Sequence, residues 1–190
     1  TSYDVEKIFS SPYKDLFNLP DQMEWMKSLS NPFRNVVKQV TLAFYPDNID
    51  DWYQQIAWSN VSKIAPWEEY TGRKDPNPND EEWDAQYNGI TKIMDAELQF
   101  FSPKVVVFIT GLTSSSTGKW DWPLFETEHY KDVHYPDNDT IVWDHTKKGT
   151  PCSAQACKFN DIVFVRCDRP EFLDQIAESK AIVELIKKNL

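Results

Sequence analysis

The stretch Pro-Lys-Val-Val-Val-Phe-Ile-Thr-Gly, residues 103–111, decides the fold class of this chain. Its middle, Val105–Ile109, is a run of five apolar residues, most of them β-branched, between a Pro and a Gly. A run without polar alternation predicts a strand buried on both faces, which is typical of parallel sheets. Because a helical pattern precedes this run, the stretch predicts one step of an α/β fold.

The sequence on both sides supplies further helices and strands. Apolar residues at helical spacing, together with capping residues, predict helices over 32–44, 80–101 and 172–189. In the first of these, Asn31 is the expected N-cap and Pro32 the first helical residue. In the last, the residues expected to be buried are Leu173, Ile176, Val183 and Ile186. Further strands are predicted at 55–61 and 161–167, with a short edge strand at 140–143.

These elements predict a single α/β domain over residues 1–190. We expect a three-layer α/β/α arrangement around a short, mainly parallel central sheet. Residues 1–30 form an N-terminal arm in this prediction, and residues 112–155 form an irregular insertion.

Composition and charge exclude several classes of protein. The net charge of −10 argues against a surface that is basic throughout, as phosphate binding would favour, but leaves room for a small basic cleft. No segment has the long apolar run of a membrane span, and the first residues lack the pattern of a signal peptide, so we expect a cytoplasmic location. The three cysteines predict free thiols, with a Cys152–Cys157 bridge as the alternative, and no cofactor is expected.

Polar residues follow three of the predicted strands. Because the carboxyl ends of parallel strands meet at one edge of a sheet, these residues are expected to converge there. Together they would suit a small polar, planar or anionic ligand, although the alternative is a capped turn with solvated charges. The side-chain amide of Asn60 has donors and an acceptor in one plane, which match the hydrogen-bonding edge of a nucleobase. The residues are Asn60, Lys63, Thr110, Gly111, Asp168 and Arg169.

Other patterns in the sequence are weaker. His129, His134 and His145, with Asp144, are candidate metal ligands, but their spacing matches no established zinc pattern and we expect no metal. The Ser/Thr/Gly loop 113–118 lacks the order of a phosphate-binding loop. No Gly-x-Ser-x-Gly is present, so a serine hydrolase is not predicted.

The order of several short motifs resembles that of a known superfamily. The segment Trp-Ser-Asn-Val-Ser-Lys-Ile-Ala-Pro, residues 58–66, is followed by Gly72-Arg73 and Asn77-Pro78. A helix containing Gln86 and Glu97 comes next, and then the strand 103–111. Over residues 31–172 this order resembles the uracil-DNA glycosylase superfamily, especially its microbial branches.

The resemblance implies roles for individual residues. Asn60 would bind the Watson–Crick edge of a flipped uracil, and Phe33 would stack on it. Asp168 and Arg169 would be the catalytic residues. The family usually has His-Pro at the positions of Arg169 and Pro170. Such an enzyme flips the base out of DNA and hydrolyses its N-glycosidic bond. The residues that contact the loop or phosphates would be Lys63, Arg73, Thr110 and Gly111. The partner would be uracil-containing DNA or a free nucleobase.

Two differences from the family pattern keep other functions open. The family's Gly-containing first motif has no counterpart, because the first glycine is Gly72, and Arg169 replaces the expected histidine. One alternative is therefore an inactive member of the fold that acts as a binding or interaction protein, and the acidic charge is compatible with a protein partner. Another is an unrelated α/β protein, including a small-molecule hydrolase that uses the histidines.

Overall fold

The structure is a computed structural model. It describes residues 26–27, 31–59, 80–110, 127–136, 139–144, 151–170 and 174–190, with the backbone alone over 80–88 and at 144. The chain divides into two compact units. The helical unit comprises Thr1–Phe17, Trp58–Ser102 and Trp122–Asp132, and the sheet unit comprises Asn18–Ala57, Pro103–Asp121 and Val133–Leu190.

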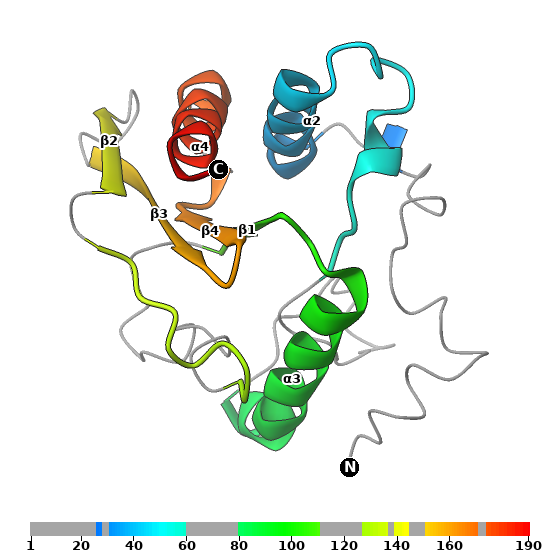
Figure 1. Cartoon of the computed structure of the whole chain (residues 1–190), viewed down its shortest axis with the longest axis vertical. Coiled ribbons are helices and arrows are strands. Elements are labelled where there is room, and N and C mark those ends of the chain that lie inside the picture. The colour runs from blue at the N-terminus through cyan, green and yellow to red at the C-terminus, as the bar shows by residue number, and fades with distance from the viewer. Residues whose placement is uncertain are drawn as a thin grey trace, which may run out of the picture. The chain divides into compact units, whose positions relative to one another are not determined.

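A four-stranded mixed sheet forms the centre of the sheet unit (Figure 1). Its spatial order is β1-β4-β3-β2, with β1 parallel to β4 and the other two pairings antiparallel. The fold is thus α/β, as predicted, but only one of the three pairings among the described strands is parallel. The strand predicted to be buried on both faces is β1; it lies at one end of this order, and of its residues only Phe108 is buried, so that prediction is wrong in this respect. The strands are β1 (Val105–Ile109), β2 (Thr140–Asp144), β3 (Pro151–Phe159) and β4 (Ile162–Cys167).

Strand β3 was not predicted, and its first residues fall in the segment expected to be irregular. Its side chains alternate between buried and partly exposed, with Cys152, Ala154 and Ala156 on the buried side. These residues are small and are not β-branched, so propensity alone does not favour a strand. The strand forms because it pairs with neighbours on both edges.

A two-residue turn joins β3 to β4. Phe159 pairs with Ile162, and the two residues between them, Asn160 and Asp161, have φ angles of 48° and 63°. Positive φ at both central positions is the property of a type I′ hairpin, in which Asn-Gly is preferred.

We expect Asp161→Gly to stabilise the protein by about 0.5–1 kcal/mol, because glycine removes the cost of a Cβ in the left-handed region. Asp161→Val is the opposite test, since a β-branched residue is strongly disfavoured there. Urea unfolding followed by circular dichroism measures both changes. Equal stability of the two variants would contradict this account of the turn.

Helices α2 (Pro32–Phe44) and α4 (Gln175–Asn189) cover one face of the sheet, side by side (Figure 1). The α2 boundary is as predicted: the Asn31 side chain accepts a hydrogen bond from the Arg34 amide at 2.8 Å. Two side-chain hydrogen bonds link the helices. Asn35 Nδ2 on α2 donates to Gln175 Oε1 at 3.1 Å, and Ser179 Oγ on α4 donates to Gln39 Oε1 at 3.0 Å. The core between these helices and the sheet contains Val36, Ala154, Ala156, Val163, Val165, Cys167, Ile182, Leu185 and Ile186.

The buried face of α4 differs in part from the prediction. Ile186 is buried and Val183 is partly buried, but Ile176 is 57% exposed and Leu173 lies outside the described residues. Ile176 lies just after the N-cap Asp174, so it precedes the turns that pack on the sheet. One carboxylate is buried on this helix instead, that of Glu178.

The opposite face of the sheet is also closed by side chains of the sheet unit. Phe164 is fully buried on β4, and Phe108 on β1 is 8% exposed. The Arg166 guanidinium lies 4.6 Å from the centre of the buried Tyr135 ring, and its Nε donates to Gln155 Oε1 at 2.8 Å. These contacts tie the 133–136 segment to β4 and β3.

A strand was predicted at 55–61, and the residues that the structure describes there do not form one. Trp52–Gln55 is a short 3-10 helix, Trp58 makes a single bridge, and residues 60 and 61 lie outside the described part. Arg34 holds the chain before α2 against this helix. Its guanidinium donates to the Met26 carbonyl at 2.6 Å and lies 5.9 Å from the Trp52 ring centre.

The helical unit is built on α3 (Asp80–Phe101), whose boundaries are as predicted. Ile90, Met94 and Leu98 are buried on its apolar side. The Tyr87 side chain lies outside the described part, and Phe101 at the end of the helix is partly exposed. No helix in the described ranges is long and apolar enough to cross a membrane.

Candidate functional site

The carboxyl ends of β1 and β4 lie next to each other in the sheet unit. These strands are parallel neighbours, and their last register pair is Ile109 with Cys167. The next residue of each strand is therefore a predicted site residue, Thr110 after β1 and Asp168 after β4. The expected convergence of polar groups at this edge holds for these two strands.

Asp168 is fixed by the neighbouring strand β3. Its carboxylate oxygen Oδ2 accepts a hydrogen bond from the Ser153 amide at 2.9 Å. Its own amide donates to the Ser153 carbonyl oxygen at 3.3 Å. Asp168 thus extends the β3–β4 ladder by one residue, and its carboxylate has a defined orientation at the end of the sheet.

Phe33 and Arg169 are brought into contact from distant parts of the sequence. The Arg169 guanidinium lies 5.7 Å from the centre of the Phe33 ring, within cation–π range. Phe33 is in the first turn of α2, directly after the capped N-terminus, and Arg169 follows Asp168 in the loop after β4. An aromatic face and a cation are therefore adjacent where the resemblance assigns a base-stacking ring and an anion-stabilising group.

The remaining predicted site residues contribute less to the described geometry. The Thr110 hydroxyl oxygen is buried without a hydrogen-bond partner, which is unusual for a buried polar atom. Asn60, Lys63, Arg73 and Gly111 lie outside the described residues.

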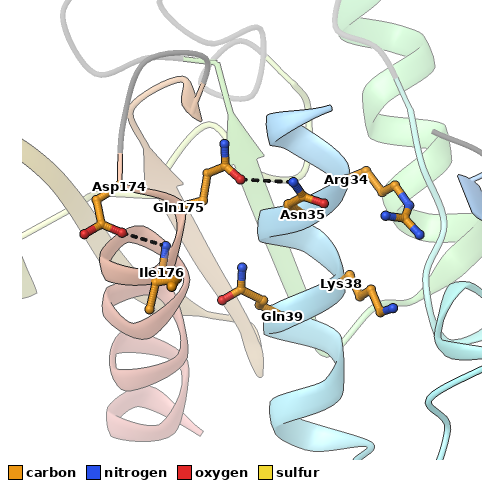
Figure 2. A pocket seen from close by; sticks show the side chains of 7 residues that line it. All are labelled: Arg34, Asn35, Lys38, Gln39, Asp174, Gln175 and Ile176. Atoms are coloured by element: carbon orange, nitrogen blue, oxygen red, sulfur yellow. Dashed lines mark hydrogen bonds between the residues drawn. The ribbon is translucent and has the colours of Figure 1, made fainter. Parts of the chain in front are cut away.

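A surface hollow of about 550 Å³ lies beside this region, between the first turns of α2 and α4 (Figure 2). It does not include Thr110, Asp168 or Arg169. Figure 2 shows Arg34 and Lys38 on the side of α2 away from α4, while Asn35 points to Gln175. The residues that line the hollow are Arg34, Asn35, Lys38, Gln39, Asp174, Gln175 and Ile176.

The hollow offers few open binding groups. The Asp174 carboxylate already accepts from the amides of Ile176 and Ala177, at 3.0 and 3.1 Å, so the N-terminus of α4 is capped. The Arg34 guanidinium is bonded to the backbone before α2, as described above. We therefore assign the candidate site to the Phe33–Arg169 contact and the β1 and β4 ends.

A buried carboxyl that the sequence did not reveal lies near Cys167, the last residue of β4. Glu178 is fully buried in the first turn of α4, and neither of its carboxyl oxygens has a hydrogen-bond partner. Burial is the main cause that raises the pKa of Glu178 to about 8; the neighbouring Cys167 thiol acts in the opposite direction, and the negative charge of Asp168 adds to the increase. Burial also raises the pKa of the thiols of Cys152 and Cys167. The Cys167 thiol donates to the Phe108 carbonyl oxygen at 3.5 Å.

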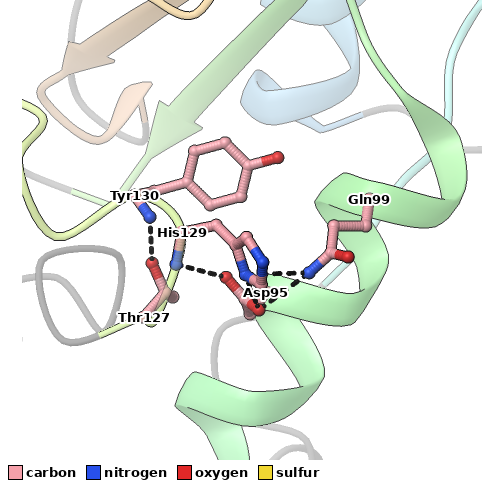
Figure 3. A network of polar contacts seen from close by, with 5 residues as sticks. All are labelled: Asp95, Gln99, Thr127, His129 and Tyr130. Atoms are coloured by element: carbon pink, nitrogen blue, oxygen red, sulfur yellow. Dashed lines mark hydrogen bonds and ion pairs between the residues drawn. The ribbon is translucent and has the colours of Figure 1, made fainter.

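The helical unit contains a separate polar network around His129 (Figure 3). The Nδ1 atom of His129 lies 2.7 Å from Asp95 Oδ2, and the His129 amide donates to Asp95 Oδ1 at 3.1 Å. Gln99 Nε2 donates to Asp95 Oδ2 at 2.9 Å. The network fixes the 127–130 turn to α3, and Gln99 Nε2 also lies 3.0 Å from His129 Nδ1.

The histidines do not form a metal site in the part of the chain that the structure describes. His129 bonds to Asp95, His134 is an exposed residue of the sheet unit, and His145 and the Asp144 side chain lie outside that part. Among the described residues, no group of three His, Cys, Asp or Glu side chains is arranged to hold a metal ion.

Comparisons with known proteins add no family assignment. No family model matches the sequence, and no curated protein or solved structure matches it either.

Proposed function

We propose that this protein binds a uracil or related base flipped out of DNA and hydrolyses its N-glycosidic bond. The observation that carries the proposal is the contact of Arg169 with the Phe33 ring, 5.7 Å from guanidinium to ring centre, at the carboxyl end of β4. An aromatic ring binds a flipped base by stacking, and a neighbouring cation favours the base as it becomes an anion.

The proposed reaction uses the two residues after β4 in different ways. Water attacks the sugar C1′ carbon as the bond from C1′ to the base nitrogen breaks; the base leaves with the bonding electrons, and the proton that the water loses ends on the released base. Arg169 stabilises the negative charge that develops on the base. Asp168, whose carboxylate is oriented by the Ser153 amide, favours the positive charge that develops on the sugar and orients the water.

The rest of the assignment extends to residues outside the described part. Asn60 would bind the Watson–Crick edge of the base, while Lys63, Arg73 and Gly111 would make the loop or phosphate contacts together with Thr110, which the structure does describe. The proposal includes the finer fold expectation, a three-layer α/β/α arrangement around a mainly parallel sheet. It also includes a role in DNA repair, with a cytoplasmic location.

One observation favours the alternative, a binding protein with this fold that does not hydrolyse the bond. The Asp168 carboxylate takes part in the pairing of β4 with β3 through Ser153, which is a structural use of the group expected to act on water. The net charge of −10 also suits a protein partner better than duplex DNA.

A single-stranded oligonucleotide with one uracil tests the proposal. We expect the wild-type protein to bind it and to form abasic sites, and Phe33→Leu to weaken binding by roughly tenfold or more, since stacking on an aromatic ring contributes about 1–3 kcal/mol per base. Arg169→Ala should lower the rate of excision by roughly 100-fold, and Arg169→His should retain more activity than Arg169→Ala.

Phe44→Leu is the matched control for Phe33→Leu. Phe44 is at the other end of α2 and also lies under a cation, Lys187, at 5.9 Å from the ring centre. If both leucine variants bind equally, Phe33 has no stacking role. Binding without abasic sites would support a base-binding protein that does not hydrolyse the bond, and no binding at all would exclude the glycosylase and leave a protein partner as the alternative.

A further inference from the structure

Glu178 is a fully buried titratable group that the proposed reaction does not use. It lies in the first turn of α4, where its amide donates to the Asp174 carbonyl at 3.0 Å. The residue is 0% exposed, and both carboxyl oxygens lack a hydrogen-bond donor. A buried ionised carboxylate without a donor or a cation is very costly, so this geometry favours the protonated acid.

Among the described residues, the groups found near Glu178 give it no counter-charge. Cys167 at the end of β4 and Cys152 on β3 are neighbouring thiols, and Asp168 is the nearby charged group, with the same sign as an ionised Glu178. On β2, Trp143 pairs with Cys152, and its indole nitrogen is also buried without a partner. On α2, the residues that face the start of α4 are the amides Asn35 and Gln39, which bond to Gln175 and Ser179.

We propose that Glu178 is a positioning residue for the loop Asp168–Pro170, which it supports when protonated and loosens when ionised. The role of this loop in base binding rests on the proposed function, whereas its movement with pH does not depend on that function. While Glu178 is neutral, it does not repel the Asp168 carboxylate, which stays bonded to Ser153. When Glu178 releases its proton to solvent, two negative charges face each other in a buried environment, and the loop moves Asp168 and Arg169 away.

The pH at which this change occurs follows from the burial of Glu178. Its pKa is raised from the usual 4.5 to about 8, chiefly by burial; the neighbouring Cys167 thiol opposes the shift and the charge of Asp168 adds to it. The loop is therefore expected to be ordered at neutral pH and to loosen in mildly alkaline solution. Arg169 would leave the Phe33 ring in the same range of pH, because it directly follows Asp168 in the chain.

Backbone hydrogen exchange of residues 167–169 tests the inference without any ligand. At pH 9 we expect these amides to exchange roughly tenfold faster in the wild type than in Glu178→Gln, which keeps the shape but cannot ionise. At pH 6.5 the two proteins should exchange at the same rate. Comparison at equal pH removes the intrinsic pH dependence of exchange.

Two further variants make the result specific. Glu184→Gln removes an exposed carboxylate from the same helix and should behave as the wild type. Asp168→Asn removes the repelling charge but keeps an oxygen for the Ser153 amide, so it should abolish the alkaline loosening even if Glu178→Gln does not fold. Equal exchange in all four proteins at pH 9 would overturn the inference.

The uracil-containing oligonucleotide then connects the loop to the proposed function. Wild-type binding should fall about tenfold between pH 7 and pH 9, and the decrease should be absent in Glu178→Gln. If no protein binds the oligonucleotide at any pH, the proposed function fails while the exchange measurement still decides the role of Glu178. Binding that falls equally in both proteins would overturn the positioning role.

Discussion

Replacement of Phe164 by alanine is expected to destabilise the sheet unit by about 3–5 kcal/mol, the usual cost of removing a buried aromatic side chain. Phe164 is fully buried on β4, the strand that pairs with both β1 and β3. The cavity would lie opposite the face covered by α2 and α4, between Val106 and Cys157, its partners in the register. Urea unfolding followed by circular dichroism measures the loss of stability.

The control for this prediction is Val142→Ala on β2. Val142 is 60% exposed, so its truncation removes little buried surface and should change stability by less than about 0.5 kcal/mol. If Phe164→Ala were as mild as Val142→Ala, Phe164 would not be part of the core.

As the pH rises, the free energy of unfolding of the wild-type protein is expected to decrease relative to that of Glu178→Gln. The pKa of Glu178 is raised from 4.5 to about 8, so the folded protein retains a proton that the unfolded chain releases. The contribution of this proton is fully present below pH 4.5 and is lost as the pH rises through about 8. The slope is at most about 1.4 kcal/mol per pH unit, which amounts to several kcal/mol over the whole range.

Urea unfolding of both proteins at several pH values between 5 and 9 measures this difference. The difference between wild type and Glu178→Gln cancels the contributions of other groups, which titrate in both proteins. We expect Glu178→Gln to become progressively the more stable protein as pH rises, with no further gain above about pH 8.5. A constant difference across the range would show that Glu178 is ionised in the folded protein.

Local sequence signals predicted the helices well and the strands less well. Asn31 with Pro32 specifies the start of α2 through contacts within a few residues, so its position does not depend on the rest of the fold. Strand β3 depends instead on its neighbours, because its small residues match no strand propensity and become a strand only between β2 and β4. The segment 55–59 has a strand-like composition but supplies no strand there.

The candidate site shows the same division. Thr110 and Asp168 could be placed at one edge from the strand pattern alone, because parallel strands end together. The contact of Phe33 with Arg169 requires α2 to pack beside the loop after β4, which no local pattern specifies. For Glu178 a signal did exist: helical spacing places it on the same stripe as Ile182 and Leu185, where a carboxylate is unexpected.

The polar contacts between α2 and α4 have a consequence for the synthesis of the chain. Each joins residues that are 140 positions apart, Asn35 with Gln175 and Gln39 with Ser179. At usual rates of translation, α2 leaves the ribosome on the order of ten seconds before α4 does. During that interval the apolar side of α2 around Val36 has no permanent cover, so this nascent chain is expected to need chaperone protection until its last helix emerges.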